Sequence, residues 1–148
     1  MINSSFLDII IALVLGACLG IERSYAGKTA GMRTYSLVSM GSCLFILISR
    51  IVIPLGGNYN FDPMRVAAGI IMGVGFLCGG VIVFKDSQLS GLTTAAGLWV
   101  AAGIGMAVGY GLQSLAIFAT IATLVVFTFF WFIEHMMFHM NEKMGPKE

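Results

Sequence analysis

Five long apolar runs, separated by short polar segments, dominate this chain of 148 residues. The runs cover residues 6–21, 35–53, 66–84, 92–110 and 112–133. Each is close to the ~17–25 residues that a helix needs to cross a bilayer. The apolar residues are continuous rather than alternating, and only helices or closed barrels satisfy every backbone polar group in lipid. The sequence therefore predicts an all-α, polytopic transmembrane helix bundle of about five spans, forming a single domain.

The composition excludes a water-soluble globule. Hydrophobic residues make up 58% of the chain and charged residues 10%, whereas soluble domains are about 25% charged. Such a chain cannot cover itself with polar surface, so we expect its main partner to be the lipid bilayer. The formal net charge of +1 gives no basis for nucleic-acid binding.

Lysines and arginines predict the orientation, because they accumulate in cytoplasmic loops. Six of them fall on one predicted side: Arg23, Lys28, Arg33, Lys85, Lys143 and Lys147. Only Arg50 and Arg65 fall on the other side. This bias predicts an N-terminus outside the membrane and a cytoplasmic C-terminus, with residues 134–148 as an amphipathic tail.

Glycine-rich surfaces predict how the helices pack. Small residues four apart let membrane helices approach closely, and three such glycine pairs occur: Gly16 and Gly20, Gly69 and Gly73, Gly105 and Gly109. The fourth run is small almost all round, so we expect it to be central. The fifth run is rich in leucine, valine and phenylalanine, which suits contact with lipid.

The third run contains four glycines within eight residues, namely Gly73, Gly75, Gly79 and Gly80. Two interpretations remain open. The glycines form either a tight packing seam or a helix break whose free backbone carbonyls bind an ion, as in some transporters.

Polar residues from three segments fall at the predicted cytoplasmic boundary: Glu22, Arg23, Arg33, Thr34, Thr93 and Thr94. We expect Glu22 to pair with Arg33 and to anchor the loop between the first two spans. A threonine hydroxyl could cap the fourth helix, whose start could also attract a small anion together with Arg33 or Lys85. The cluster is therefore interpreted as either an ion-pair network or an anion site.

A second group of charges lies on the predicted outer side. Asp8 is about one turn inside the boundary, Arg50 is near the same level, and Arg65 begins the third span. Ionisable residues in spans are costly and are candidates for function. An Asp8–arginine pair is one interpretation, and a cation entrance is the other.

Catalytic and metal-binding patterns do not stand out in the sequence. No Ser-His-Asp or Cys-His arrangement and no paired intramembrane carboxylates are evident, and His135 and His139 lack an H-E-x-x-H arrangement. We expect a protein that is not an enzyme and that has neither a cofactor nor a metal site.

Several blocks of residues, in order, carry a family resemblance. They are Glu22-Arg23 with Ala30-Gly31-Met32-Arg33-Thr34, Asp62-x-x-Arg65 with Gly73-x-Gly75-Phe76-Leu77-x-Gly79-Gly80, and Gly91-Leu92-Thr93-Thr94-Ala95-Ala96-x-x-Trp99. From about Gly16 to Gly111, the chain resembles the MgtC/SapB family of bacterial inner-membrane proteins. It departs from the family at Gly69, where glutamine is common, and at Ser90, where arginine is common. The missing arginine weakens the case for an anion site.

The resemblance implies an inner-membrane protein linked to growth in low magnesium, to survival of pathogens inside host cells and to restraint of the ATP synthase. Many relatives carry a C-terminal ACT-like domain, and we expect a short form without it. The leading hypothesis is a regulator of ion and membrane-energy homeostasis that binds other membrane proteins and forms a homodimer. The alternative is a transporter or channel for a small ion or solute, such as Mg²⁺.

Overall fold

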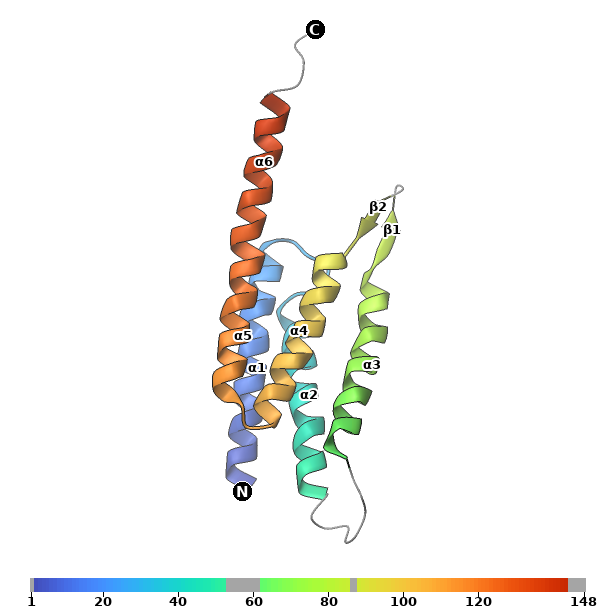
Figure 1. Ribbon diagram of the computed structural model, residues 1–148, viewed down its shortest axis with the longest axis vertical. Helices are drawn as coiled ribbons and strands as arrows, with labels where there is room; N and C mark the ends of the chain where they lie inside the picture. The colour runs from blue at the N-terminus through green and yellow to red at the C-terminus, as the bar shows by residue number, and fades with distance from the viewer. Residues whose placement is uncertain (1, 53–61, 86–87, 144–148) are drawn as a thin grey trace.

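The computed structural model describes residues 2–52, 62–85 and 88–143 as a bundle of helices (Figure 1). The helices in chain order are α1 (Ile2–Tyr25), α2 (Met32–Val52), α3 (Pro63–Val81), α4 (Leu92–Gly109), α5 (Gln113–Val125), the π-helical segment η2 (Val126–Phe130) and α6 (Trp131–Lys143). The last three form one rod. Five stretches are long and apolar enough to span a membrane, which confirms the predicted all-α polytopic bundle.

The predicted spans match the helices except near the connections. The third helix ends at Val81 and not at residue 84, because Val83–Lys85 (β1) pairs antiparallel with Gln88–Ser90 (β2). Val83 and Phe84 are residue types that favour strands. Because they are also apolar and continue the third apolar run, the sequence predicts them as part of the helix. Residue 53 of the second predicted span lies outside the described part, as do residues 144–148 of the tail, including Lys147.

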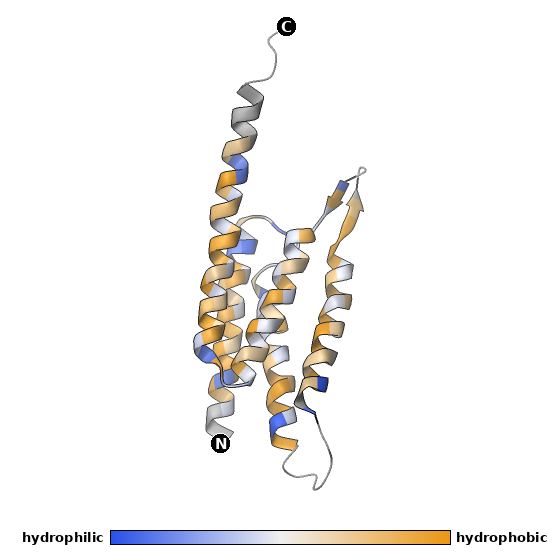
Figure 2. Cartoon of the chain, in the orientation of Figure 1, coloured by the Kyte–Doolittle hydropathy of each residue, from blue (hydrophilic) through white to orange (hydrophobic). Residues whose placement is uncertain are grey.

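Helix α4 lies at the centre of the bundle, as its small residues predicted. It packs against α1, α2, α3 and α5, whereas α3 and the α5–α6 rod stand at opposite edges (Figure 1). The connection from α4 to α5 is tight: Gly111 has a φ of 82°, and the Leu112 amide donates to the Ala107 carbonyl at 2.8 Å. Figure 2 shows that the helices are largely hydrophobic along their lengths.

The centre of the bundle is closed where α1, α2 and α4 meet. A Cβ atom on Gly16 would lie 2.6 Å from the Tyr35 carbonyl oxygen, and one on Gly105 would collide with the Ser39 carbonyl oxygen. The Ser39 hydroxyl also donates to the Ala12 carbonyl of α1 at 2.8 Å. Glycines therefore bring these backbones together, and little space remains between them.

Candidate functional site

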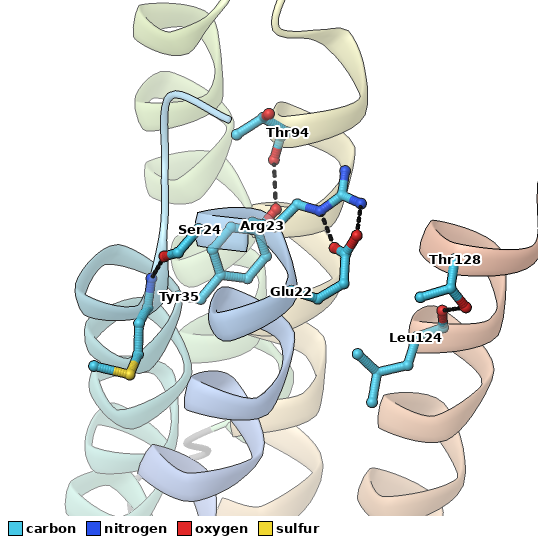
Figure 3. A network of polar contacts seen from close by, with 8 residues as sticks. Glu22, Arg23, Ser24, Tyr35, Thr94, Leu124 and Thr128 are labelled. Carbon is cyan, nitrogen blue, oxygen red and sulfur yellow. Dashed lines mark hydrogen bonds and ion pairs between the residues drawn. The ribbon is translucent and has the colours of Figure 1, made fainter. Parts of the chain in front are cut away.

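The cytoplasmic cluster is built around a buried arginine at the end of α1. Arg23 is 3% exposed, and its guanidinium forms a bidentate ion pair with the neighbouring Glu22 carboxylate (Figure 3). Arg23 Nη2 donates to Glu22 Oε1 at 2.6 Å, and Nε donates to Oε2. A buried arginine needs such a partner because an uncompensated buried charge is strongly destabilising.

An aromatic ring from the far end of the chain covers this ion pair. The Arg23 guanidinium carbon lies 3.7 Å from the centroid of the Phe127 ring, a cation–π contact. Phe127 belongs to η2 and is the buried residue of that π-helical segment. A Cβ atom on Gly97 would lie 2.6 Å from the same ring. The π-helical turn thus places Phe127 between α1 and α4.

Tyr35 connects α2 to the start of α4 in the same region. Its side chain is fully buried, and its hydroxyl donates to the Thr94 carbonyl at 3.2 Å. The tyrosine hydroxyl also lies where a side chain on Gly97 would be. The sequence analysis missed Tyr35, Gly97 and Phe127, since each reads there as an ordinary residue of an apolar run.

The predicted Glu22–Arg33 pair is wrong: in the structure Glu22 pairs with Arg23 instead. The loop between α1 and α2 is held by Ser24, whose hydroxyl accepts the Met32 amide at 3.1 Å (Figure 3). Arg33 and Thr34 are exposed at the start of α2. A charge-assisted pair with the adjacent residue leaves Arg33 available for other contacts.

The start of α4 also differs from the prediction that a threonine caps it. The N-cap is Gly91, whose φ of 89° is left-handed, and no side-chain hydrogen bond caps the helix. The Gly91 carbonyl accepts a hydrogen bond from the Ala95 amide at 2.9 Å. Thr93 is exposed, and Thr94 is buried and contributes its backbone carbonyl to Tyr35.

The outer charges are partnered differently from the predicted Asp8–arginine pair. Asp8 Oδ1 accepts a hydrogen bond from Gln113 Nε2 at 2.9 Å. Arg50 donates through Nη1 to the Gly109 carbonyl at 2.8 Å, at the C-terminal end of α4, where a cation is favoured by the helix dipole. Arg65 is exposed near the start of α3. Asp8 and Arg50 therefore have separate partners, and neither pairs with the other.

Helix α3 is continuous through its glycine-rich stretch, which corrects the interpretation of a helix break. A Cβ atom would meet nothing within 4 Å at five of its positions: Gly69, Gly73, Gly75, Gly79 and Gly80. The glycines of α1 and three of the four in α4, by contrast, lie against neighbouring backbone or side chains, and Gly103 is the exception. Among residues 2–52, 62–85 and 88–143, the glycines of α3 are therefore not a packing seam.

Two separate surfaces of α3 result. One faces α2 across an apolar groove of about 810 Å³, which Gly69 and Gly73 line together with Leu77. The other surface, which we call the glycine face, consists of Ala68, Gly75 and Gly79. These three residues are exposed and recur at i, i+7 and i+11, so they share one side of the helix.

Comparisons with known proteins agree with the resemblance noted above. A sequence model described as MgtC family matches residues 9–136. The chain is 38% identical over 131 residues to the "Putative magnesium transporter YhiD" of Escherichia coli K12, covering 83% of this chain and 60% of that protein. It is 36% identical over 134 residues to Protein SrpB of Synechococcus elongatus, covering 82% and 72%.

A further relative is Protein MgtC of Salmonella typhimurium strain 14028s. It is 42% identical over 90 residues, covering 61% of this chain and 36% of the relative. The chain thus spans about three fifths of YhiD and about a third of MgtC. No solved structure matches the chain.

Proposed function

The chain belongs to the MgtC family of membrane proteins, and from this premise we propose that it is a non-enzymatic inner-membrane regulator that binds transmembrane helices of other proteins. The binding surface in this proposal is the glycine face of α3. The proposal rests on one observation. The glycines where α1 and α4 meet α2, such as Gly16 and Gly105, are buried in close contacts, whereas Gly75 and Gly79 face open space.

An open glycine face needs a physical reason. Glycine in a helix interior costs about 1 kcal/mol relative to alanine, and no close contact with the described part of the chain compensates for Gly75 or Gly79. Two such residues one turn apart let the backbone of a second helix approach. Phe76, 84% exposed, follows Gly75 directly and offers a large apolar side chain beside the shallow surface.

A second copy of the chain is one partner that this face would fit. A two-fold dimer is the commonest symmetric assembly, and it would bury the same face from each copy. We expect the purified chain in mild detergent to have the mass of a dimer. A monomeric mass both in detergent and in native membranes would contradict the homodimer and leave a different membrane protein as the partner.

The resemblance adds a process and a further partner. Family members are linked to magnesium and membrane-energy homeostasis and to the ATP synthase, and we extend both links to this chain. The test is growth in low magnesium of a bacterium that depends on the chain. The double variant Gly75→Leu with Gly79→Leu should fail to restore growth in low magnesium. The control Gly103→Leu should restore it, although it also adds a side chain where a Cβ meets nothing within 4 Å.

The second candidate function is transport of a small ion, which the name of the relative YhiD favours. In the described part of the chain, no group of three or more His, Cys, Asp or Glu could hold a metal ion. Magnesium prefers oxygen ligands and keeps several waters, and the half-buried Asp8 is bonded to Gln113. Liposomes that contain the chain and a magnesium indicator decide between the candidates, because flux above empty liposomes would support transport.

The proposed location is the bacterial inner membrane, with the N-terminus outside and the C-terminus in the cytoplasm. The α1–α2 loop, which contains Lys28, and the start of α2 lie at the opposite end of the bundle from the end of α2 and the start of α3 (Figure 1). Arg33 is at the start of α2, and Arg50 and Arg65 are at its end and at the start of α3. Cysteines introduced at Lys28 and Leu112, in a variant without native cysteines, test the orientation in intact cells. Labelling from outside at position 112 and not at 28 is expected, and the reverse would overturn the orientation.

A further inference from the structure

The groove between α2 and α3 has an unusual combination of features: an apolar floor and a cation at one end. Leu37 and Gly41 of α2 face Gly73 and Leu77 of α3 across it, and Arg33 and Thr34 line its end near the α1–α2 loop. A Cβ atom on Gly41 or Gly73 would meet nothing within 4 Å. The glycines therefore leave the groove open where larger residues would narrow it.

The length of the groove matches one leaflet of a bilayer. Its lining on α2 extends from Arg33 to Phe45, which at 1.5 Å per residue is ~18 Å of helix. The hydrocarbon core of a bilayer is about 30 Å thick, so one leaflet contributes ~15 Å. A groove that begins at the end of a span and runs this far accommodates an acyl chain parallel to the helices.

The charge at the mouth of the groove selects the headgroup. Arg33 is exposed, and within residues 2–52, 62–85 and 88–143 no carboxylate forms an ion pair with it. The nearest acidic residue in the sequence, Glu22, is paired with Arg23. Lys28, also exposed, precedes it in the loop. A guanidinium binds phosphate oxygens bidentately, and the Thr34 hydroxyl can donate one more hydrogen bond.

We propose that the α2–α3 groove is a binding site for one anionic phospholipid, with the phosphate at Arg33 and Thr34 and an acyl chain along Gly41 and Gly73. The groove and the glycine face are different surfaces of α3, so this proposal and the proposed function can fail separately. The lipid would fill the space between α2 and α3, which no side chain of the described residues fills.

The test measures lipids retained by the purified full chain, using native mass spectrometry after incubation with equal amounts of phosphatidylglycerol and phosphatidylcholine. We expect one phosphatidylglycerol to remain bound in preference to phosphatidylcholine. Arg33→Gln should weaken the phosphatidylglycerol interaction about fivefold, the effect of removing one cation near an anionic lipid. Arg65→Gln, which removes an exposed arginine at the other end of the bundle, should leave it unchanged.

A second pair of variants tests the acyl-chain part of the site. Gly73→Leu should displace both lipids because its side chain enters the groove, whereas Gly103→Leu on α4 should retain phosphatidylglycerol as the unchanged chain does. Equal retention of the two lipids by the unchanged chain would overturn the proposal. Unaltered retention of phosphatidylglycerol by Gly73→Leu would also overturn it. The same holds if a cysteine introduced at position 41, in the groove, cross-links to a second copy or to another protein.

Discussion

Replacing Glu22 with alanine removes the only ion-pair partner that the described structure gives to Arg23. The two side chains are 4% (Arg23) and 19% (Glu22) exposed, so the arginine left behind stays almost fully buried. Breaking a buried ion pair from one side costs about 3–5 kcal/mol. Water reaches the glutamate side of this pair, and the Phe127 ring still faces the guanidinium, so we expect a loss near the lower end of that range.

The assay is the free energy of unfolding of the purified chain in mixed detergent micelles. Glu22→Ala should lose about 3 kcal/mol, and Arg33→Ala, at an exposed position, about 0.5 kcal/mol or less. Glu22→Ala combined with Arg23→Met should lose less than the sum of the single changes, by a coupling of about 0.5–3 kcal/mol. Two results would refute the Glu22–Arg23 ion pair: equal losses of unfolding free energy for Glu22→Ala and Arg33→Ala, or a double variant whose loss equals the sum of the single losses.

Three further substitutions test other contacts by the same unfolding measurement. Gly105→Ala should destabilise the chain by about 1–3 kcal/mol, because the added Cβ collides with the Ser39 carbonyl oxygen; a loss no greater than that of Gly103→Ala would contradict the close contact. Gln113→Ala should cost about 1–3 kcal/mol, since Asp8 loses the amide that donates to it, and no change would mean that water replaces this bond freely. Phe127→Leu should cost about 0.5–2 kcal/mol through loss of the cation–π contact, and this cost should disappear when Arg23 is replaced by methionine.

The spans could be predicted from the sequence because long apolar runs in lipid allow few alternatives. The central place of α4 was also predictable, since a helix with small residues all round has no bulky side to expose to lipid. The roles of the glycine pairs in α1, α3 and α4 could not be distinguished from the sequence, because their spacing is identical. Only the packing shows that Gly16 and Gly105 are in close contact while Gly69 and Gly73 line a groove.

The ion pairs were harder to predict, because the sequence indicates only that several charged residues lie at the same membrane boundary. It does not indicate which of them pair. Glu22 could reach either Arg23 or Arg33, and the choice involves the Phe127 ring, which comes from the fifth span and covers Arg23. Asp8 was expected to prefer an arginine, but the amide of Gln113 binds it at the tight α4–α5 connection. A signal was present in the sequence, since Gln113 follows the turn on the same predicted side as Asp8.

The most direct test of helix binding by the glycine face is photo-cross-linking from position 79 in native membranes. A photoreactive residue replacing Gly79 should produce adducts with a second copy or with another membrane protein, and these adducts should disappear when Gly75 is also replaced by leucine. The same residue replacing Gly103 is the control and should give no such adducts. Adducts with lipid alone from position 79, in cells where the chain is functional, would contradict helix binding at this face.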